Sequence, residues 1–236
     1  MAIKTTLVIL TRNEITGLKS LIRKIPINSV DECFAVDFKS TDGTVEFFKD
    51  NNIRVISQKI PGRGEAFKLA ARKAKGQYLI FFSPDGNENP ADIPKLIIML
   101  DKGADLVIAS RFMQGSRNEE DDKFLKFRAW ANRGFTLIAK LIWGGTVTDS
   151  INGYRAIRKV AFNQLQLDAA GFAIEFQMTI RALKLNLKTK EIPTIEGNRI
   201  GGKSGSKAIP TGFKFIYYLM REIKIGKKFQ KNSDRI

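Results

Sequence analysis

Residues 76–90 read GQYLIFFSPDGNENP, a pattern that predicts a buried strand running into a polar turn. Tyr78–Phe82 is an unbroken apolar run with aromatic and branched side chains, which is typical of a parallel strand covered by helices on both faces. The turn then carries four polar side chains, those of Ser83, Asp85, Asn87 and Glu88. Ligands of open α/β sheets bind outside the carboxyl ends of the strands, so we expect this turn to border a binding site.

The polar turn has two interpretations. An acid and an amide two residues apart, Asp85 and Asn87, suit a hard cation that carries a diphosphate, which makes them candidate ligands for Mg²⁺ or Mn²⁺. Alternatively, the turn only joins a strand to a helix, and Asn89 or Asp92 caps that helix. These residues alone leave both interpretations open.

The composition excludes several kinds of chemistry. The 236 residues are 43% apolar, enough for one large domain or a domain with an appendage, and they include no histidine. Catalysis by Ser-His-Asp or Cys-His pairs and histidine-rich zinc sites are therefore excluded. The single cysteine, Cys33, lies in an apolar run and cannot form a disulfide within the chain.

The charge pattern bears on location and partners. The longest stretch without a charged residue, Gly76–Pro84, is nine residues long, which is too short to cross a bilayer. The amino end has no signal-peptide pattern, so we expect a cytoplasmic protein. A net charge of +16 favours an anionic partner, such as nucleic acid, an anionic membrane surface or phosphorylated substrates.

Strand and helix patterns alternate along the chain. Short β-rich runs are predicted at Thr5–Leu10, Cys33–Asp37, Ile53–Ser57, Tyr78–Phe82 and Asp105–Ala109. Helical patterns follow the first four of these runs, and this order predicts an α/β fold with a mostly parallel central sheet and helices on both faces. No G-x-G-x-x-G follows the first run, which argues against a dinucleotide-binding domain.

Each predicted strand is followed by polar residues, namely Arg12-Asn13-Glu14, Asp37, Arg63, Asp85 and Arg111. Alternating acids and bases along one edge suit a nucleotide with a metal-bound diphosphate, and Gly62 and Gly64 would let backbone approach a planar base. Each residue taken alone also fits a helix cap or a solvated loop charge.

Seven short motifs occur in the order found in one enzyme family. They are TRNE at 11–14, VDFKSTDGT at 36–44, GRG at 62–64, SPDG at 83–86, ASR at 109–111, DSINGYR at 149–155 and RIGGKS at 199–204. Over residues 5–207 the chain therefore resembles the GT-A-fold glycosyltransferases of family 2. Within that family it is most similar to the polyprenyl-phosphate sugar synthases typified by dolichyl-phosphate mannose synthase.

The resemblance implies a role for each matching residue. It places Glu14, Asp37, Gly62 and Arg63 at the base and ribose of a nucleotide-sugar donor, and Asp85 and Asn87 at the metal. It implies that the positive charge around the donor diphosphate and the acceptor phosphate comes from Arg111, Arg128 and Arg199. Asp149 and Arg155 match the acceptor-side loop, and Glu175 matches the helix behind that loop.

Two positions depart from the family pattern. Phe38 stands where the family usually has a second acid after Asp37, and Ser83 replaces the first acid of the Asp-x-Asp metal motif. With one carboxylate fewer, metal affinity should fall, although Ser83 can still hold a metal-bound water. Loss of metal dependence, or a catalytically silent relative, is the alternative outcome.

The residue types suit a phosphate acceptor. A sugar hydroxyl acceptor needs a general base, whereas a phosphate monoester with a second pKa near ~6 is already nucleophilic at neutral pH. Catalysis then reduces to positioning and to neutralising the departing diphosphate. The loop 197–207 carries Lys203 and Lys207 among glycines and serines, and we interpret it either as a lid over anionic substrate or as a linker.

The carboxyl-terminal region, 211–236, is treated as a segment separate from a glycosyltransferase domain at 1–210. Its basic helix has one apolar face, formed by Phe213, Ile216, Tyr217, Met220 and Ile223. Such a helix suits an anionic membrane surface, or it packs on the domain with its charges solvated. The first reading makes the protein a peripheral one on the cytoplasmic face of the membrane.

Three functions follow from these features. The first is an inverting glycosyltransferase that moves a sugar from a GDP- or UDP-linked donor to a polyprenyl phosphate. The second is a family 2 transferase that acts on a polysaccharide, glycolipid or protein. The third, a nucleic-acid-binding protein, rests on charge alone, because the chain has no aromatic stacking platform or binding motif, so we expect no specific nucleic-acid partner.

Overall fold

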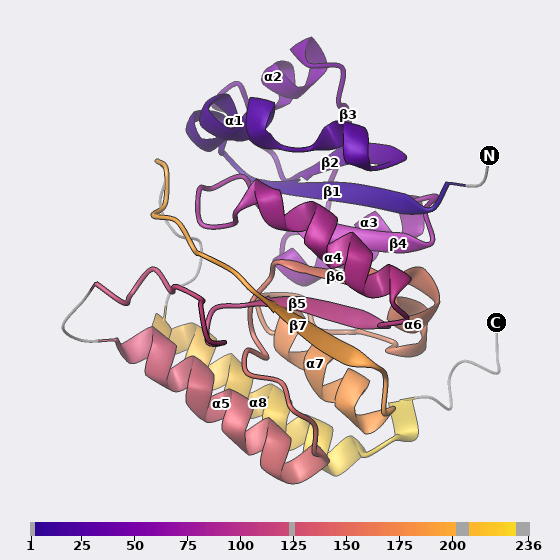
Figure 1. The fold of residues 1–236 in the computed structure, drawn as a ribbon, viewed down its shortest axis with the longest axis vertical. Helices are drawn as coiled ribbons and strands as arrows, with labels where there is room; N and C mark the ends of the chain where they lie inside the picture. The colour runs from indigo at the N-terminus through magenta and orange to yellow at the C-terminus, as the bar shows by residue number, and fades with distance from the viewer. Residues whose placement is uncertain (1–2, 123–125, 202–207, 230–236) are drawn as a thin grey trace.

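A computed structural model describes residues 3–122, 126–201 and 208–229 of the chain, the side chains of 208 and 209 excepted. These residues form an α/β domain around a seven-stranded sheet in the order β3-β2-β1-β4-β6-β5-β7 (Figure 1). The strands are β1 Thr5–Thr11, β2 Glu32–Asp37, β3 Arg54–Ser57, β4 Tyr78–Phe82, β5 Leu106–Ser110, β6 Arg155–Arg158 and β7 Thr189–Pro193. Only β6 is antiparallel to its neighbours, β4 and β5, so the carboxyl ends of the other strands share one edge.

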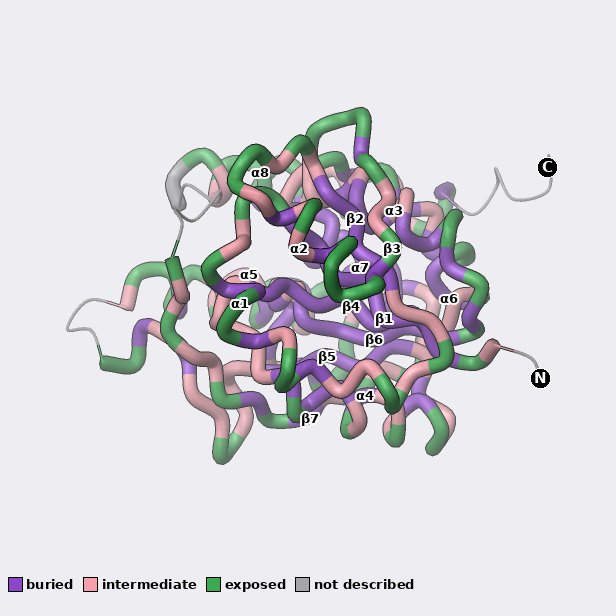
Figure 2. The backbone as a smooth tube through the Cα atoms, turned by 90° about the horizontal axis from the view of Figure 1, so that it is seen from above, coloured by how far each residue is buried: buried purple, intermediate pink, exposed green. Residues whose placement is uncertain are grey.

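Helices cover both faces of the sheet. The α-helices are α1 Ile15–Leu21, α2 Thr44–Asp50, α3 Arg63–Lys73, α4 Ile93–Asp101, α5 Phe127–Trp143, α6 Lys159–Gln164, α7 Ile174–Lys184 and α8 Ala208–Ile225. Three short 3₁₀ turns are η1 Ile22–Lys24, η2 Ile27–Ser29 and η3 Pro90–Asp92. One buried core joins the sheet to α3, α6 and α7 with α5 and α8 outside them, and a second core joins it to α1, α2 and α4 (Figures 1 and 2).

The predicted fold class is confirmed, and all five predicted runs lie within one residue of a strand at each end. β4 has the predicted bounds Tyr78–Phe82, and all five of its residues are buried. β6 was not predicted, because its sequence RAIR carries an arginine at each end. The arginine at its start, Arg155, is fully buried and donates to the carbonyl oxygens of Asn152 and Glu175, so its charge is satisfied inside the protein.

Helix α8 packs against α5 and α7 with a mixed face. Phe215 of α8 contacts Phe135 of α5 and Phe176 of α7, with ring centroids 5.4 and 5.5 Å away. Leu219 and Glu222 are also buried on this side. The proposed domain boundary after Pro210 falls within the first turn of α8. The apolar face that the sequence predicts is the opposite one, and all five of its side chains are between 45% and 70% exposed.

Candidate active site

A cavity of about 1020 Å³ opens at the carboxyl edge of the sheet. The ends of β1, β2 and β4 form one side, and the amino-terminal turns of α5 and α8 form another. Eight residues predicted from the sequence line it, namely Glu14, Gly62, Arg63, Asp85, Asn87, Arg111, Arg128 and Arg199. The parallel sheet therefore brings together residues that are up to 185 positions apart in the chain, as between Glu14 and Arg199.

Arg199 bridges two carboxylates in this cavity. Its Nη1 lies 2.6 Å from Asp85 Oδ2, and its Nη2 lies 2.6 Å from Glu14 Oε1. Backbone contacts fix the segment that carries it, because Ile200 N donates to Asp85 O at 2.7 Å. The Nε of Arg199 is buried and has no hydrogen-bond partner among the described residues.

Gly86 permits this approach of Arg199 to the polar turn. Its φ is +97°, in the region that favours glycine, and an added Cβ would lie 2.8 Å from Asn198 O and 2.9 Å from Ile200 N. A side chain at position 86 would therefore push the segment that carries Arg199 away from Asp85. The glycine of SPDG thus serves the geometry of the site.

Arg63 lies on the other side of the turn and is held by α7. Its Nε donates to Glu175 Oε1, and its Nη1 donates to Ser83 Oγ at 3.2 Å. A Cβ on Gly153 would lie 2.1 Å from Arg63 Nη2, so the loop before β6 leaves room for this guanidinium. The second carboxylate oxygen of Glu175, Oε2, is buried without a hydrogen-bond partner among the described residues.

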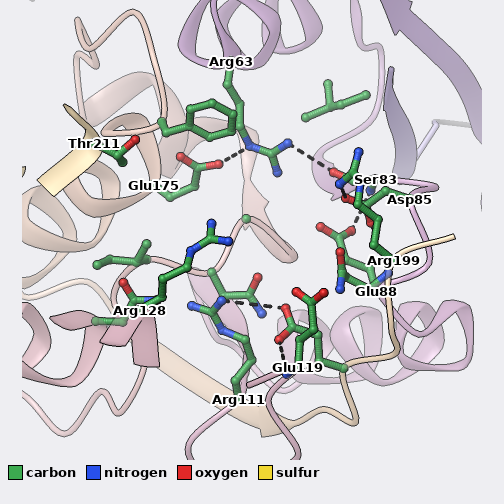
Figure 3. A pocket seen from close by; sticks show the side chains of 18 of the residues that line it. Arg63, Ser83, Asp85, Glu88, Arg111, Glu119, Arg128, Glu175, Arg199 and Thr211 are labelled. Carbon is green, nitrogen blue, oxygen red and sulfur yellow. Dashed lines mark hydrogen bonds and ion pairs between the residues drawn. The ribbon is translucent and has the colours of Figure 1, made fainter. Parts of the chain in front are cut away.

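Arg111 and Arg128 supply positive charge near α5. Arg111 donates from Nε to Asp149 Oδ2 at 2.7 Å and from Nη2 to Asp149 Oδ1 at 3.1 Å. Burial alone would raise the pKa of Asp149, but the Arg111 charge, together with hydrogen bonds from Arg111 and Ile151, outweighs it and holds that pKa below its ordinary value. Arg128 is exposed and projects into the cavity, and its guanidinium has no hydrogen bond or ion pair within the described parts of the chain (Figure 3).

Three predicted substrate-binding residues, Asp37, Asp149 and Arg155, do not line the cavity. Asp37 is buried at the end of β2 and accepts hydrogen bonds from Thr11 Oγ1, Ser40 N and Ser40 Oγ, which hold the loop after β2. The Asp149 carboxylate orients Arg111, and Arg155 is buried against backbone carbonyls. Lys203 and Lys207 lie outside the described residues. A ligand contact by any of these five remains a prediction.

Gly62 and Gly64 were expected to let the backbone approach a planar base, but both of them pack against protein backbone. A Cβ on Gly64 would lie 1.9 Å from Ala169 O, and one on Gly62 would lie 2.2 Å from Ala170 O. Both glycines therefore make room for the chain's own segment before α7. Gly62 also lines the cavity, whereas the space beside Gly64 is filled by protein backbone.

Three glutamates that line the cavity, Glu119, Glu120 and Glu196, were not predicted from the sequence. Glu88 of the polar turn and Glu175, to which the sequence already pointed, line it as well. Burial raises the pKa of Glu88 to about 8 against the lowering effect of Arg63. Burial likewise raises the pKa of Glu14 to about 7 against the effect of Arg199. Glu119, Glu120 and Glu196 lie in loops, where no periodic pattern would have singled them out.

The residues at the turn fit a divalent cation that arrives with a diphosphate. Within the described ranges, no group of three or more His, Cys, Asp or Glu side chains is placed to hold a metal alone. However, Mg²⁺ is commonly held by one or two carboxylates together with substrate phosphates. Asp85, Glu14 and the Asn87 amide supply oxygens of the right kind, and the guanidinium between the two carboxylates occupies a place suited to a cation.

Comparisons of sequence find relatives that are named as glycosyltransferases or mannosyltransferases. The glycosyl transferase family 2 matches residues 6–166. Glycosyltransferase AglJ of Haloferax volcanii is 28% identical over 78% of this chain and 60% of the relative. Dolichol-phosphate mannosyltransferase of Pyrococcus furiosus is 27% identical over 99% of this chain and 66% of the relative. Undecaprenyl-phosphate mannosyltransferase of Micrococcus luteus is 28% identical over 84% of this chain and 85% of the relative. The chain thus spans less than two thirds of the first two relatives.

Comparisons of structure give the same fold. Glucosyl-3-phosphoglycerate synthase from Mycobacterium tuberculosis, in complex with Mn²⁺, uridine diphosphate and phosphoglyceric acid, matches with a TM-score of 0.75. The identity is 21%, and the match covers 93% of this chain and 78% of that chain. A complex of the same enzyme with Mg²⁺ and uridine diphosphate matches with a TM-score of 0.70 at 20% identity. At these identities the likeness establishes the fold.

Proposed function

The chain belongs to glycosyl transferase family 2, and we propose that it moves a sugar from a GDP- or UDP-linked donor to a polyprenyl phosphate, with inversion at the sugar carbon. Two of its relatives are named as dolichol-phosphate and undecaprenyl-phosphate mannosyltransferases, which supports a lipid phosphate as the acceptor. Mg²⁺ or Mn²⁺ is the proposed cofactor, carried by the donor diphosphate and held by Asp85 and Asn87.

The observation that carries the proposal is the position of the cavity beside an apolar surface. The cavity is lined by Phe127 and Arg128 of α5 and by Gly212 and Phe215 of α8, and both helices start there. We call the outward residues of these helices the α5–α8 apolar surface; they are Phe127, Trp130, Leu137, Ile138, Leu141, Ile142, Phe213, Ile216, Tyr217, Met220 and Ile223. Each is at least 41% exposed, and α5 and α8 lie side by side (Figure 1).

An exposed apolar surface of this extent indicates contact with a membrane or another protein. Four basic residues, Arg128, Arg133, Lys214 and Lys224, are exposed on the same two helices, and the chain carries a net charge of +16. Apolar side chains flanked by lysine and arginine suit an anionic bilayer surface. No helix in the described parts of the chain is long and apolar enough to span a membrane, so this proposal is peripheral binding on the cytoplasmic face.

The proposed reaction needs no general base from the protein. The acceptor phosphate is ionised at neutral pH, so one of its oxygens can attack the sugar carbon directly. Arg128 and Arg111 lie at the α5 side of the cavity, where a lipid phosphate entering from the apolar surface would arrive. Glu14, Gly62 and Arg63 lie at the strand ends, where we place the donor nucleoside, and Lys203 and Lys207 are proposed to cover the phosphates.

The test is transfer of labelled sugar from a panel of UDP- and GDP-sugars to polyprenyl phosphate in detergent, with Mg²⁺, with Mn²⁺ and with chelator. We expect label in the organic phase with one donor type and none without the lipid phosphate. If label appears instead in a polysaccharide, glycolipid or protein, the proposed acceptor is wrong and the glycosyltransferase activity is supported. If no label is transferred, titration with UDP and GDP is the next measurement. A protein that binds neither nucleotide would be a catalytically silent relative.

A further inference from the structure

The contacts of Arg199 suggest a function beyond charge neutralisation. Its guanidinium lies between Asp85 and Glu14, at 2.6 Å from each, and 17% and 13% of those side chains are exposed. Asp85 is also the carboxylate that is proposed to hold the metal of the donor complex. One positive group therefore already occupies the place that a divalent cation would take.

The charge of the cavity lining supports such an arrangement. Seven acidic residues line it, Glu14, Asp85, Glu88, Glu119, Glu120, Glu175 and Glu196, against five arginines, Arg12, Arg63, Arg111, Arg128 and Arg199. The acids therefore offset the arginines, and the lining offers a donor diphosphate without a cation no excess of positive charge. Conversely, Asp85 and Glu14 would repel each other if Arg199 left and no cation replaced it.

Arg199 is also equipped to bind a phosphate once it is displaced. Its buried Nε has no partner among the described residues, and a buried donor without a partner costs free energy that a bound oxygen would recover. A guanidinium has five N–H donors in a planar fork that matches phosphate oxygens. Gly201, two residues after Arg199, has a φ of +73° and precedes the part of the sequence that carries Lys203 and Lys207.

We propose that Arg199 is an exchangeable internal cation. It holds Asp85 and Glu14 together, it would leave this place when a divalent cation arrives with the donor diphosphate, and it would then bind the anionic substrate. The metal therefore binds with the donor and not before it. In the transfer that follows, the sugar carbon–oxygen bond to the diphosphate breaks with its electron pair on the diphosphate, an acceptor phosphate oxygen forms the new bond, and no proton moves. This inference rests on the proposed function.

The test measures Mn²⁺ binding by electron paramagnetic resonance, with and without UDP or GDP. We expect the wild-type protein to bind Mn²⁺ at least about tenfold more tightly with the nucleotide than without it. Arg199→Gln leaves Asp85 and Glu14 unpaired, and it should bind Mn²⁺ without nucleotide at least about tenfold more tightly than the wild type. Arg199→Lys keeps a positive charge and should show a smaller gain.

Arg23→Gln is the matched control, because Arg23 is exposed on η1 outside the cavity and the variant has the same change in net charge. It should bind Mn²⁺ as the wild type does. Equal Mn²⁺ affinity of wild type and Arg199→Gln without nucleotide would overturn the exchange. So would the absence of Mn²⁺ binding in every variant, with or without nucleotide. In either case, transfer of labelled sugar to the lipid phosphate would still support the proposed function, and its absence would reject that function separately.

Discussion

The α5–α8 apolar surface gives a quantitative prediction for membrane binding. Leu141 and Phe213 are 77% and 70% exposed, the most exposed large apolar side chains on their helices. Full burial of a leucine or phenylalanine side chain contributes about 1.5–3 kcal/mol, so roughly three quarters of that, ~1–2 kcal/mol, is available from each in a membrane. The double variant Leu141→Ser/Phe213→Ser should therefore lose ~2–4 kcal/mol of binding free energy, about 30- to 1000-fold in partition coefficient.

The assay is cosedimentation with vesicles that contain anionic phospholipid, at two salt concentrations. Because both side chains face solvent, the variant should keep the circular dichroism spectrum and melting temperature of the wild type. Ile98→Ser is the control, since Ile98 is half exposed on α4, which packs on the other face of the sheet. If the double variant sedimented with vesicles as the wild type does, or if Ile98→Ser lost as much binding, the surface would have to be reassigned to a protein partner.

Substitution tests this surface better than removal of α8 does. Phe215 and Leu219 of that helix belong to the core, at 5% and 7% exposure. Truncation after Pro210 would take both side chains out of the core and destabilise the domain, as the loss of large core side chains does. A lower affinity of the truncated protein for vesicles would then have two causes. The serine variants leave the buried face of α8 unchanged.

Three further predictions concern stability and reactivity. Glu222→Gln should cost about 3 kcal/mol of unfolding free energy in urea, because it leaves the buried Arg181 and Lys184 without their carboxylate. Asp168 has a pKa lowered to about 2, in spite of partial burial, by hydrogen bonds from Arg221 and Gln177. Its stabilisation is present above pH ~4 and is lost as the pH falls toward 2; since this side chain is 45% exposed, Asp168→Asn should remove less than about 1 kcal/mol of it. Burial raises the pKa of Cys33 to about 12, so iodoacetamide should label it slowly at pH 8 in the folded protein and rapidly in urea.

Each of these three has a direct check. Glu46 is exposed on α2, and Glu46→Gln changes the charge equally but should stay within about 0.5 kcal/mol of the wild type. A Glu222→Gln variant as stable as this control would show that the network contributes nothing net. The unfolding free energy of the wild type should fall more steeply between pH 4 and 2 than that of Asp168→Asn. Equal pH dependence in the two proteins would contradict the role given to that carboxylate. Equal labelling rates of Cys33 in the folded and unfolded protein would contradict its burial.

The sequence predicts the parts of the fold that have a strong local pattern. β4 is recognisable because five apolar residues lie between Gln77 and Ser83. β6 is not, since its four residues include two arginines and its pairing partners, β4 and β5, are distant in the chain. β7 spans Thr189–Pro193, and its start is hard to recognise because Thr189 and Lys190 are polar at the edge of the sheet. Both strands depend on pairing with distant parts of the chain, which the local sequence does not reveal.

The same limit applies to the orientation of side chains. The period of the apolar residues predicts that α8 is a helix with one apolar face, and it leaves the direction of that face open. The direction is decided by Phe215 and Leu219, which fit beside Phe135 and Phe176 and turn the other face outward. Strand ends gather at the cavity as predicted from topology, whereas the burial of Asp37 and Asp149 follows from loop hydrogen bonds that the sequence does not specify.

Two buried atoms connect the stability of the site to its proposed chemistry. Glu175 Oε2 and Arg199 Nε are the buried side-chain atoms without a hydrogen-bond partner among the described residues, and both residues line the same cavity. A buried unpaired polar group costs about 1–3 kcal/mol, so folding alone does not explain either one. An acceptor at Glu175 suits a hydroxyl of the transferred sugar, and a donor at Arg199 suits a phosphate oxygen. A sugar and a phosphate bound together would satisfy both atoms, which favours a substrate that contains both.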